Sequence, residues 1–450
     1  MASPSQPAPQ HPQSLLTVFL DQPPSCLQFC PAAPDYAVIG TYLLSETKSQ
    51  AEDENADVVI QQNKTGSLQL WKLDPIGPKL SLIQMLHFPY AVFDLQFHPT
   101  RHSLLAIATS TGSVALFNTN SSATAAPVIS QLWTHSAHED PFVSALFLSW
   151  APRDWFKNPQ TDGFAVTFSD GRTTLFSSAK GNISDEDSLS ESGIFEAKQT
   201  IEMWFVALAT IDEKKMESKA RIPYIFTGDD FGALYTRQFE SITSTSGGDH
   251  GDSYDATEVV EEETDTAQML PLQDFTDRAR HHTAGITSIL PLPVSLEVND
   301  DAPLLLTGSY DEHLRVFCDT RPGKVLAEHS LGGGVWRLQL LNVKRGEEAV
   351  GLDMESDRAE YPRRFEFLVL ASCMHAGTRV VKVTWFDNEE DPHGNWTIEV
   401  LAEFTEHESM NYASDIWRGG GEPTAKRRQE LLCVSSSFYD RRVCVWKFEV

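Results

Sequence analysis

One pattern recurs along this chain: an apolar strand, a tight polar turn, and a second strand that ends in an aromatic residue. Residues 306–317 show it most clearly, with the turn at residues 310–312 and Phe317 at the end. Strands of the same kind end at Trp71, Phe117, Phe176, Tyr235, Trp385 and Trp446. The pattern therefore predicts about seven copies of one β unit, at irregular spacing.

The repeat and the chain length together predict the fold class. Units of roughly 40–45 residues are typical of a WD-repeat β-propeller blade, and about seven of them plus insertions use up the chain. We therefore expect an all-β, seven-bladed WD-repeat β-propeller over residues 15–450, after a disordered N-terminal tail at residues 1–14. Residues 15–20 are expected to pair with the last strand, because its edge would otherwise stay open.

Four polar stretches interrupt the β pattern. They lie at about residues 46–63, 182–199, 241–268 and 346–364, and most of them are acidic. Propeller loops tolerate long insertions because the entropy of loop closure grows slowly with length. We expect solvated loops, since these stretches hold few apolar residues; a docking surface for a basic partner is the alternative.

Charge and targeting signals limit the partners. The net charge of −28 would repel a phosphate backbone, so no nucleic acid is expected. The Pro-rich N-terminus lacks the features of a signal peptide, and no apolar run is long enough to span a membrane. Six cysteines show no paired spacing, which predicts neither disulfides nor a metal site. We expect a cytoplasmic protein without a membrane partner.

One set of polar residues has a structural interpretation. His282, Thr307 and Asp311, with Phe317, occupy the places of the buried hydrogen-bonded set of a WD blade. No strong enzyme motif is present, such as a nucleophile elbow, a zinc-protease helix or a Walker loop. From motifs alone, an interaction scaffold is the default interpretation.

Several strings resemble one family. Residues 24–31, 40–44, 306–312, 331–337, 372–377 and 437–440 are similar to the WD-repeat protein of diphthamide biosynthesis. This is the diphthine methyl ester hydrolase family, long named diphthine methyltransferase. The chain departs from the family's pattern at Ala376, where the family has Asn, and at residues 317–319 and 412–417.

The resemblance implies a reaction. A member of this family would hydrolyse the methyl ester of methylated diphthine on elongation factor 2, without a cofactor, and leave a free carboxylate. The alternative is a non-catalytic adaptor that presents elongation factor 2 to another enzyme. A true methyltransferase is not supported, because no Gly-rich loop between a strand and a helix is present to bind a nucleotide.

Propeller geometry groups the distinctive strings at one rim. The turn between the second and third strands opens on the same face as the loop that enters the innermost strand. We interpret residues 309–313, 373–377 and 437–440 as such turns, and residues 332–337 and 412–417 as such entry loops. The polar residues of blades five to seven should then surround one mouth of the channel.

Ester cleavage at this rim would need a nucleophile or activated water, a base, and donors for the oxyanion. The catalytic candidates are His375, Asp415, Glu312, Cys373 and Asp440. His375 is the preferred general base, although it could equally be a structural turn residue. An acyl-enzyme on Ser309, Cys373 or Ser437 and direct water attack both remain open, and either Arg337 or the backbone amides of residues 332–334 could hold the oxyanion.

The substrate also carries a quaternary ammonium group, which aromatic faces bind. The binding candidates are Trp336, Arg337, Tyr310, Tyr412, Tyr439 and Trp417. A catalytic metal usually needs three protein ligands, and no such spacing is visible, so none is expected.

Overall fold

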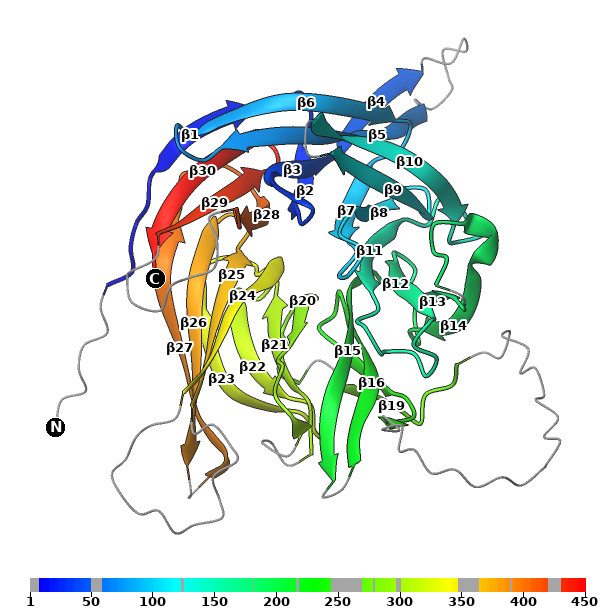
Figure 1. The fold of residues 1–450 in the computed structure, drawn as a ribbon, viewed down its shortest axis with the longest axis vertical. Helices are drawn as coiled ribbons and strands as arrows, with labels where there is room; N and C mark the ends of the chain where they lie inside the picture. Colours follow the sequence, from blue (N-terminus) through cyan, green and yellow to red (C-terminus); the bar gives the residue numbers. More distant parts are fainter. Residues whose placement is uncertain are drawn as a thin grey trace.

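Seven antiparallel sheets form a ring around a central axis (Figure 1). The computed structural model describes residues 8–49, 59–122, 125–179, 181–215, 218–243, 269–277, 280–296, 301–346, 364–388, 391–419 and 430–450. This part of the chain contains no α-helix, and one short 3₁₀ helix is Glu186–Ser188. The predicted all-β, seven-bladed propeller is confirmed.

The first four blades are described here from the innermost strand outward. Blade one is β2 (Pro24–Cys30), β3 (Ala33–Thr41), β5 (Val59–Asp74) and β6 (Lys79–Phe88), with β4 (Leu43–Ser49) paired to β5. Blade two is β7 (Val92–Phe97), β8 (Leu104–Thr109), β9 (Ser113–Ser122) and β10 (Ala125–Ser136). Blade three is β11 (Ala145–Trp150), β12 (Asp162–Phe168), β13 (Arg172–Ser178) and β14 (Ser190–Glu196). Blade four is β15 (Met203–Lys215), β16 (Ser218–Asp229), β17 (Leu234–Gln238) and β19 (Gln273–Asp277), with β18 (Ile242–Thr243) paired to β16.

The last three blades repeat this order. Blade five is β20 (Ile286–Pro291), β21 (Leu304–Ser309), β22 (His313–Cys318) and β23 (Lys324–Ser330). Blade six is β24 (Arg337–Gly346), β25 (Arg364–Ser372), β26 (Thr378–Asn388) and β27 (Asp391–Phe404). Blade seven is β28 (Asn411–Ile416), β29 (Glu430–Ser437), β30 (Arg442–Glu449) and β1 (Ser14–Phe19).

The two ends of the chain close the ring. β1 pairs with β30 in antiparallel register, with Thr17 opposite Cys444, and Figure 1 shows the blue and red strands side by side. The predicted closing strand is thus confirmed. The predicted disordered tail is wrong for residues 10–14, because Gln10 forms backbone hydrogen bonds of 2.8 and 2.9 Å with β27. Residues 1–7 lie outside the described residues.

The predicted insertions have different outcomes. The prediction is wrong for residues 182–199, since β14 is the outer strand of blade three, and Ile183 and Phe195 are buried in the core. Residues 46–49 and 59–63 extend the β4–β5 hairpin. The rest of that insertion, residues 50–58, and the segments 244–268 and 347–363 fall outside the described residues.

Each sheet packs between two neighbouring blades, so its strands are apolar on both faces. All six residues of β8 are buried, for example, which explains its continuous apolar sequence. The expected blade-five network also forms: His282 Nε2 lies 2.8 Å from Thr307 Oγ1, and Asp311 Oδ2 accepts a hydrogen bond from the backbone of Thr283. These contacts hold the inner part of the blade to the turn above it.

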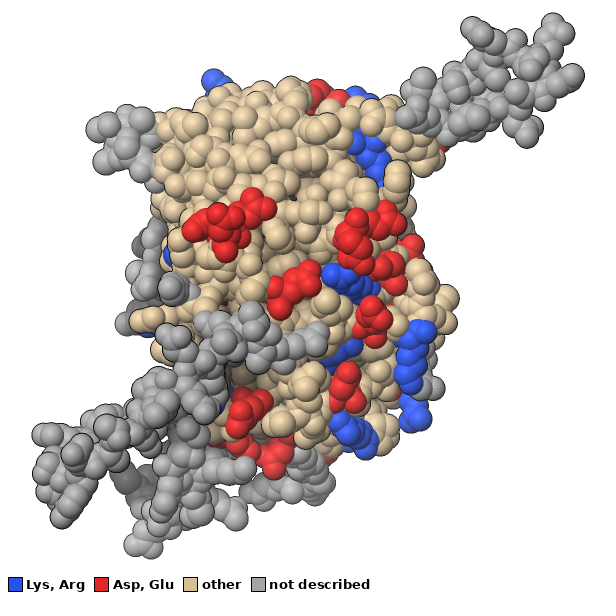
Figure 2. All heavy atoms as spheres, turned by 90° about the vertical axis from the view of Figure 1, so that its right-hand side faces the viewer, with Lys and Arg blue, Asp and Glu red and all other residues tan. Residues whose placement is uncertain are grey.

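Charged side chains are spread over the outer surface. On the side shown in Figure 2, Asp and Glu side chains lie in several separate groups with Lys and Arg side chains between them. The net charge of −28 is therefore not gathered into one patch on this side. No helix in the described part of the chain is long and apolar enough to cross a membrane.

Candidate functional site

The innermost strands begin at one end of the channel, and six of them carry a β-bulge at the start. The register shifts there in β2, β7, β11, β15, β20 and β28. A bulge leaves one residue unpaired and redirects its side chain. Three of the bulged residues are aromatic, namely Phe93, Trp204 and Tyr412, and in blade six Trp336 directly precedes β24.

These residues belong to a continuous chain of aromatic side chains around the mouth of the channel, which we call the mouth arc. Neighbouring ring centroids are 4.9–6.1 Å apart. The members of the mouth arc are Trp204, Tyr310, Trp336, Tyr412, Phe438, Tyr439, Tyr42 and Phe93. Aromatic pairs at these distances pack favourably, so the arc is an ordered surface.

Carboxylates lie at one end of the mouth arc. Trp204 Nε1 donates a hydrogen bond of 2.7 Å to Asp230 Oδ1. Burial raises the pKa of Tyr310, and the negative charges of Asp230 and Glu202 raise it further, so its phenol stays neutral. Aromatic faces beside a carboxylate attract an organic cation.

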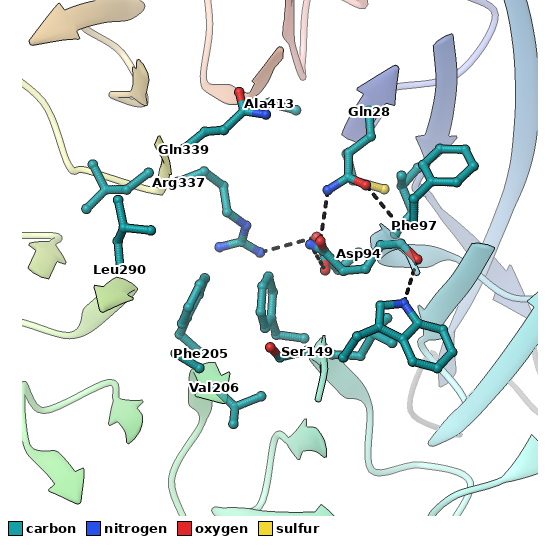
Figure 3. Close-up of a pocket in the computed structure, with 18 of the residues that line it drawn as sticks. Gln28, Asp94, Phe97, Ser149, Phe205, Val206, Leu290, Arg337, Gln339 and Ala413 are labelled. Atoms are coloured by element: carbon teal, nitrogen blue, oxygen red, sulfur yellow. Dashed lines mark hydrogen bonds and ion pairs between the residues drawn. The ribbon is translucent and has the colours of Figure 1, made fainter. Parts of the chain in front are cut away.

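A cavity of about 420 Å³ lies in the channel, and all seven innermost strands line it. Arg337 and Asp94 face each other across this space (Figure 3), with Arg337 Nη2 3.8 Å from Asp94 Oδ1. We call these two residues the channel pair. Asp94 directly follows Phe93, and Arg337 directly follows Trp336, so the channel pair lies one residue along the strands from the mouth arc.

Arg337 is held by aromatic rings and backbone carbonyls. Its guanidinium carbon lies 4.6 Å from the ring centre of Phe147 and 4.8 Å from that of Trp336. Its Nη1 donates to the carbonyl oxygens of Thr287, at 3.2 Å, and Trp336, at 2.9 Å. Burial lowers the pKa of Arg337 from its ordinary high value, and Asp94 opposes that shift, so the side chain remains a fixed cation.

Asp94 is 3% exposed, and Gln96 Nε2 donates a hydrogen bond of 2.9 Å to its Oδ2. Burial raises the pKa of Asp94 to about 6, although Arg337, Gln96 and nearby backbone amides favour the carboxylate. A carboxylate with a pKa near neutral pH can accept a proton, and the adjacent cation can stabilise a developing oxyanion.

This chain is similar in sequence to one known protein and similar in fold to solved structures. No family model matches the chain. Over 166 residues the chain is 28% identical to the diphthine methyltransferase of Schizosaccharomyces pombe, a match that covers 37% of this chain and 38% of that protein. This match confirms the predicted resemblance to the diphthine methyl ester hydrolase family.

Solved structures of Sqt1 are similar in fold. The Saccharomyces cerevisiae protein is 12% identical, with a TM-score of 0.50, and the comparison covers 97% of this chain and 98% of that one. The Chaetomium thermophilum protein has a TM-score of 0.49 at 12% identity, covering 95% of this chain and 97% of that one. The yeast structure supports the propeller fold and nothing beyond it.

The binding residues predicted from the diphthine methyl ester hydrolase resemblance lie mostly at the mouth. Trp336, Tyr310, Tyr412 and Tyr439 are in the mouth arc, and Arg337 is in the channel pair. The predicted entry loop at residues 412–417 is wrong, because residues 411–416 form β28. Trp417 follows that strand at the opposite end, where its Nε1 donates to Asp35.

The predicted catalytic residues at the turns do not meet. His375 is exposed in the turn between β25 and β26, and Glu312 lies in the turn between β21 and β22. Among the described residues, no hydrogen bond or ion pair joins His375 to Glu312, Asp415 or Asp440. Cys373 is fully buried, and burial raises the pKa of its thiol to about 12, so the thiol stays protonated.

Asp415 holds three blades together. Its Oδ2 accepts a hydrogen bond from the backbone of Phe29, and its Oδ1 accepts one from Gln339 Nε2, both at 2.8 Å. Burial raises the pKa of this carboxyl. These bonds explain its position without a role in chemistry.

Asp440 has the place in blade seven that Asp311 has in blade five. It accepts hydrogen bonds from the backbone of Glu408, at 3.1 Å, and from Ser437 Oγ. Deeper in the blade, Ser435 Oγ lies 2.7 Å from His407 Nε2 and 2.9 Å from Trp446 Nε1. Asp440 is thus part of a structural network that the sequence analysis did not identify.

Sequence reasoning missed Asp94, Trp204, Phe438, Tyr42 and Phe93. For Asp94 a signal was available, because residues 92–97 are an apolar strand with one ionisable residue inside it. A charged group in a buried strand is costly unless it has a partner. The aromatic residues gave no such signal, since aromatic residues are common throughout propeller blades.

Proposed function

We propose that this chain hydrolyses the methyl ester of methylated diphthine on elongation factor 2, which leaves a carboxylate and releases methanol. The observation that carries the proposal is the mouth arc directly above the channel pair. The arc offers aromatic faces and a carboxylate to a trimethylammonium group. The partial similarity to a protein named diphthine methyltransferase supports the same substrate.

The chemistry of diphthine fits the spacing of these two features. Its quaternary nitrogen and its ester carbonyl carbon are bonded to the same carbon atom, so they lie only about 2.5 Å apart. A site for this group needs its cation-binding surface and its carbonyl-activating residues side by side. Phe93 with Asp94, and Trp336 with Arg337, are consecutive residues on two strands that face each other across the channel.

The substrate is a side chain of a folded protein, and the mouth is open to such a partner. Tyr439 is 69% exposed and Phe231 is 60% exposed, and both lie in turns between second and third strands. Exposed aromatic residues of this kind are common in protein interfaces. The modified side chain would enter the channel while the rest of elongation factor 2 stays on the outer face.

A non-catalytic adaptor is the second candidate function. It is favoured by the arrangement of the turn residues, because His375 has no carboxylate partner among the described residues and Cys373 is a buried, protonated thiol. An adaptor would use the mouth arc to hold elongation factor 2 for another enzyme. It would need no base and no oxyanion donor.

Mass spectrometry separates the two functions. Purified protein is incubated with elongation factor 2 that carries methylated diphthine, with no added cofactor. Hydrolysis predicts that the factor loses the mass of one CH2 group and that methanol appears. An unchanged mass, with the factor still co-eluting with this protein, would support the adaptor.

The mouth arc predicts a binding defect at Trp336. Trp336→Ala removes one face of the cation site, and a cation–π contact contributes about 0.5–2 kcal/mol, so kcat/KM should fall by roughly three- to thirtyfold. Trp396→Ala is the matched control, because Trp396 lies on the outer strand β27, where its Nε1 donates to His393. Equal values of kcat/KM for the two folded variants would contradict the assignment of the arc.

A further inference from the structure

We infer that Asp94 is the general base of a hydrolytic site in the channel and that Arg337 stabilises the oxyanion. This inference rests on the proposed function and adds the residues that carry out its chemistry. It places the reaction inside the channel rather than at the turns where the sequence predicted it. The positions of the two side chains, their surroundings and the protonation state of Asp94 support it.

The geometry leaves room for a reacting group. Arg337 Nη2 and Asp94 Oδ1 form an ion pair at 3.8 Å, which is longer than a hydrogen bond, so an oxygen atom of water or substrate beside the pair can bind to both. Figure 3 shows the two side chains pointing toward one another from opposite sides of the cavity. A carboxylate has about four lone-pair positions and a guanidinium has five N–H donors, so Asp94 can accept one more hydrogen bond and Arg337 can donate one more.

The surroundings strengthen electrostatic interactions at the channel pair. Phe147 and Phe205 stack with ring centroids 4.1 Å apart, and the guanidinium of Arg337 lies against both rings. Asp94 is almost fully buried. In such a region of low dielectric constant, a fixed cation stabilises a developing negative charge much more than it would in water.

The protonation state suits a base. Burial raises the pKa of Asp94 to about 6, so the carboxylate is mostly ionised at pH 7 but is a stronger base than an exposed aspartate. Two titratable side chains face Asp94 from other strands: Arg337 on β24 and Cys26 on β2. Burial raises the pKa of Cys26 far above neutral, so its thiol stays uncharged in this range.

The reaction balances with one water molecule. Asp94 takes a proton from water as the water oxygen forms a bond to the ester carbonyl carbon, and the oxyanion faces Arg337. When the intermediate collapses, the bond from that carbon to the methoxy oxygen breaks, and protonated Asp94 gives its proton to the leaving methoxide. The products are methanol and a carboxylic acid, which loses its proton to solvent.

The test is the pH dependence of kcat/KM for Asp94→Asn. We expect activity to fall by about 100- to 10,000-fold, which is the usual contribution of a general base. In the wild type, activity should rise with pH through about 6, as Asp94 ionises, and Asp94→Asn should lose this acid limb. Binding of the methylated factor should remain, because the mouth arc is intact.

A control separates this role from stability. Asp162→Asn removes another carboxylate, which pairs with Arg101 and His98 outside the central channel, and it should keep the acid limb. Thermal unfolding shows whether each variant is folded. If Asp94→Asn does not fold, Asp94→Glu tests the role of Asp94 instead. Its carboxylate lies in a different position, so the pH at which kcat/KM rises should change.

Each outcome has one meaning. If the wild type releases no methanol, the proposed function and this inference both fail. If the wild type releases methanol and folded Asp94→Asn keeps its rate and its acid limb, only the inference fails. An acid limb that stays in place in Asp94→Glu would also overturn it. Loss of activity with retained binding in Asp94→Asn supports it.

Discussion

Two buried carboxylates line the channel cavity, Asp415 and Asp94, and their contacts differ. Asp415 accepts hydrogen bonds from two other blades, through Phe29 and Gln339. Asp94 accepts hydrogen bonds from the Gln96 side chain and from the backbone of Leu95 and Leu148, and it forms an ion pair with Arg337 at 3.8 Å. Asp415 was a candidate from the sequence and Asp94 was not, because residue type and family resemblance do not report which carboxylate meets a cation across the channel.

The burial of His407 in blade seven predicts that the stability of the fold depends on pH. Burial lowers the pKa of His407 to about 4, whereas an unfolded histidine has a pKa near 6.5. Between these values the unfolded chain binds the extra proton, so the contribution of His407 to stability is present above about pH 6.5 and is lost as the pH falls toward 4. His407→Gln should therefore show a smaller loss of stability between pH 7 and pH 5 than the wild type.

Urea unfolding at the two pH values measures this difference. His11→Gln is the comparison variant, because the His11 side chain is 67% exposed whereas that of His407 is buried. Identical pH dependence in the wild type and His407→Gln would show that the histidine does not titrate as its burial requires.

The backbone conformation of Glu312 predicts that replacing this residue by glycine stabilises the fold. Its φ of 71° is in the left-handed region, and the equivalent turn positions in other blades are Gly112, Gly171, Gly232 and Gly377. Glycine adopts this conformation without steric cost, although it loses more entropy on folding, so Glu312→Gly should stabilise the fold by about 0.5–1 kcal/mol. Glu312→Ala keeps the Cβ atom and should give no such gain.

Chemical denaturation of the three proteins tests the assignment. If the free energy of unfolding rises in both variants, or in neither, the left-handed backbone conformation at residue 312 does not destabilise the wild type. The same variants report on the catalytic role predicted for Glu312 from its place at the rim, which stays a prediction.

A strand could be predicted from the sequence where a neighbouring strand would otherwise have an open edge. The closing strand followed from the open edge of β30, and β1 indeed covers it. β14 was missed because its sequence is mostly polar, and only Ile183 before it and a few residues within it reach the core. The bulges in the innermost strands were also missed, since strands that are buried on both faces have no regular polar–apolar alternation for an extra residue to interrupt.

The closing strand predicts unequal effects of two N-terminal truncations. Removal of residues 1–20 deletes β1, exposes the edge of β30, and removes apolar contacts of Leu16, Val18 and Leu20. We expect a loss of roughly 5 kcal/mol from these side chains and self-association through the open edge. Within the described residues, removal of residues 1–13 deletes the hydrogen bonds of Gln10 with β27 and with Glu449 and the ion pair of His11 with Glu403, and it leaves β1 in place, so its effect should be smaller.

Thermal unfolding of the two truncated proteins measures the loss of stability, and size-exclusion chromatography measures self-association. If both unfold at the same temperature and both remain monodisperse, β1 does not close the ring in the way that its register with β30 indicates.

The whole ring decides which residues meet, and this is where the sequence is least informative. The strand pattern fixed the number of blades, because each blade is a local unit with its own turn and aromatic end. Asp94 and Arg337 come from blades two and six and meet only across the closed channel. That encounter depends on the closure of all seven sheets, which no local pattern encodes.

In the proposed reaction, water cleaves the ester within this chain's own channel. The most direct measurement is mass spectrometry of elongation factor 2 carrying methylated diphthine after incubation with purified protein in ¹⁸O-labelled water. The account predicts methanol without label and a product carboxylate that contains one ¹⁸O atom. A demethylated product without ¹⁸O would show that the methyl group had been transferred instead, and an unreacted factor would show that the chain is not a hydrolase.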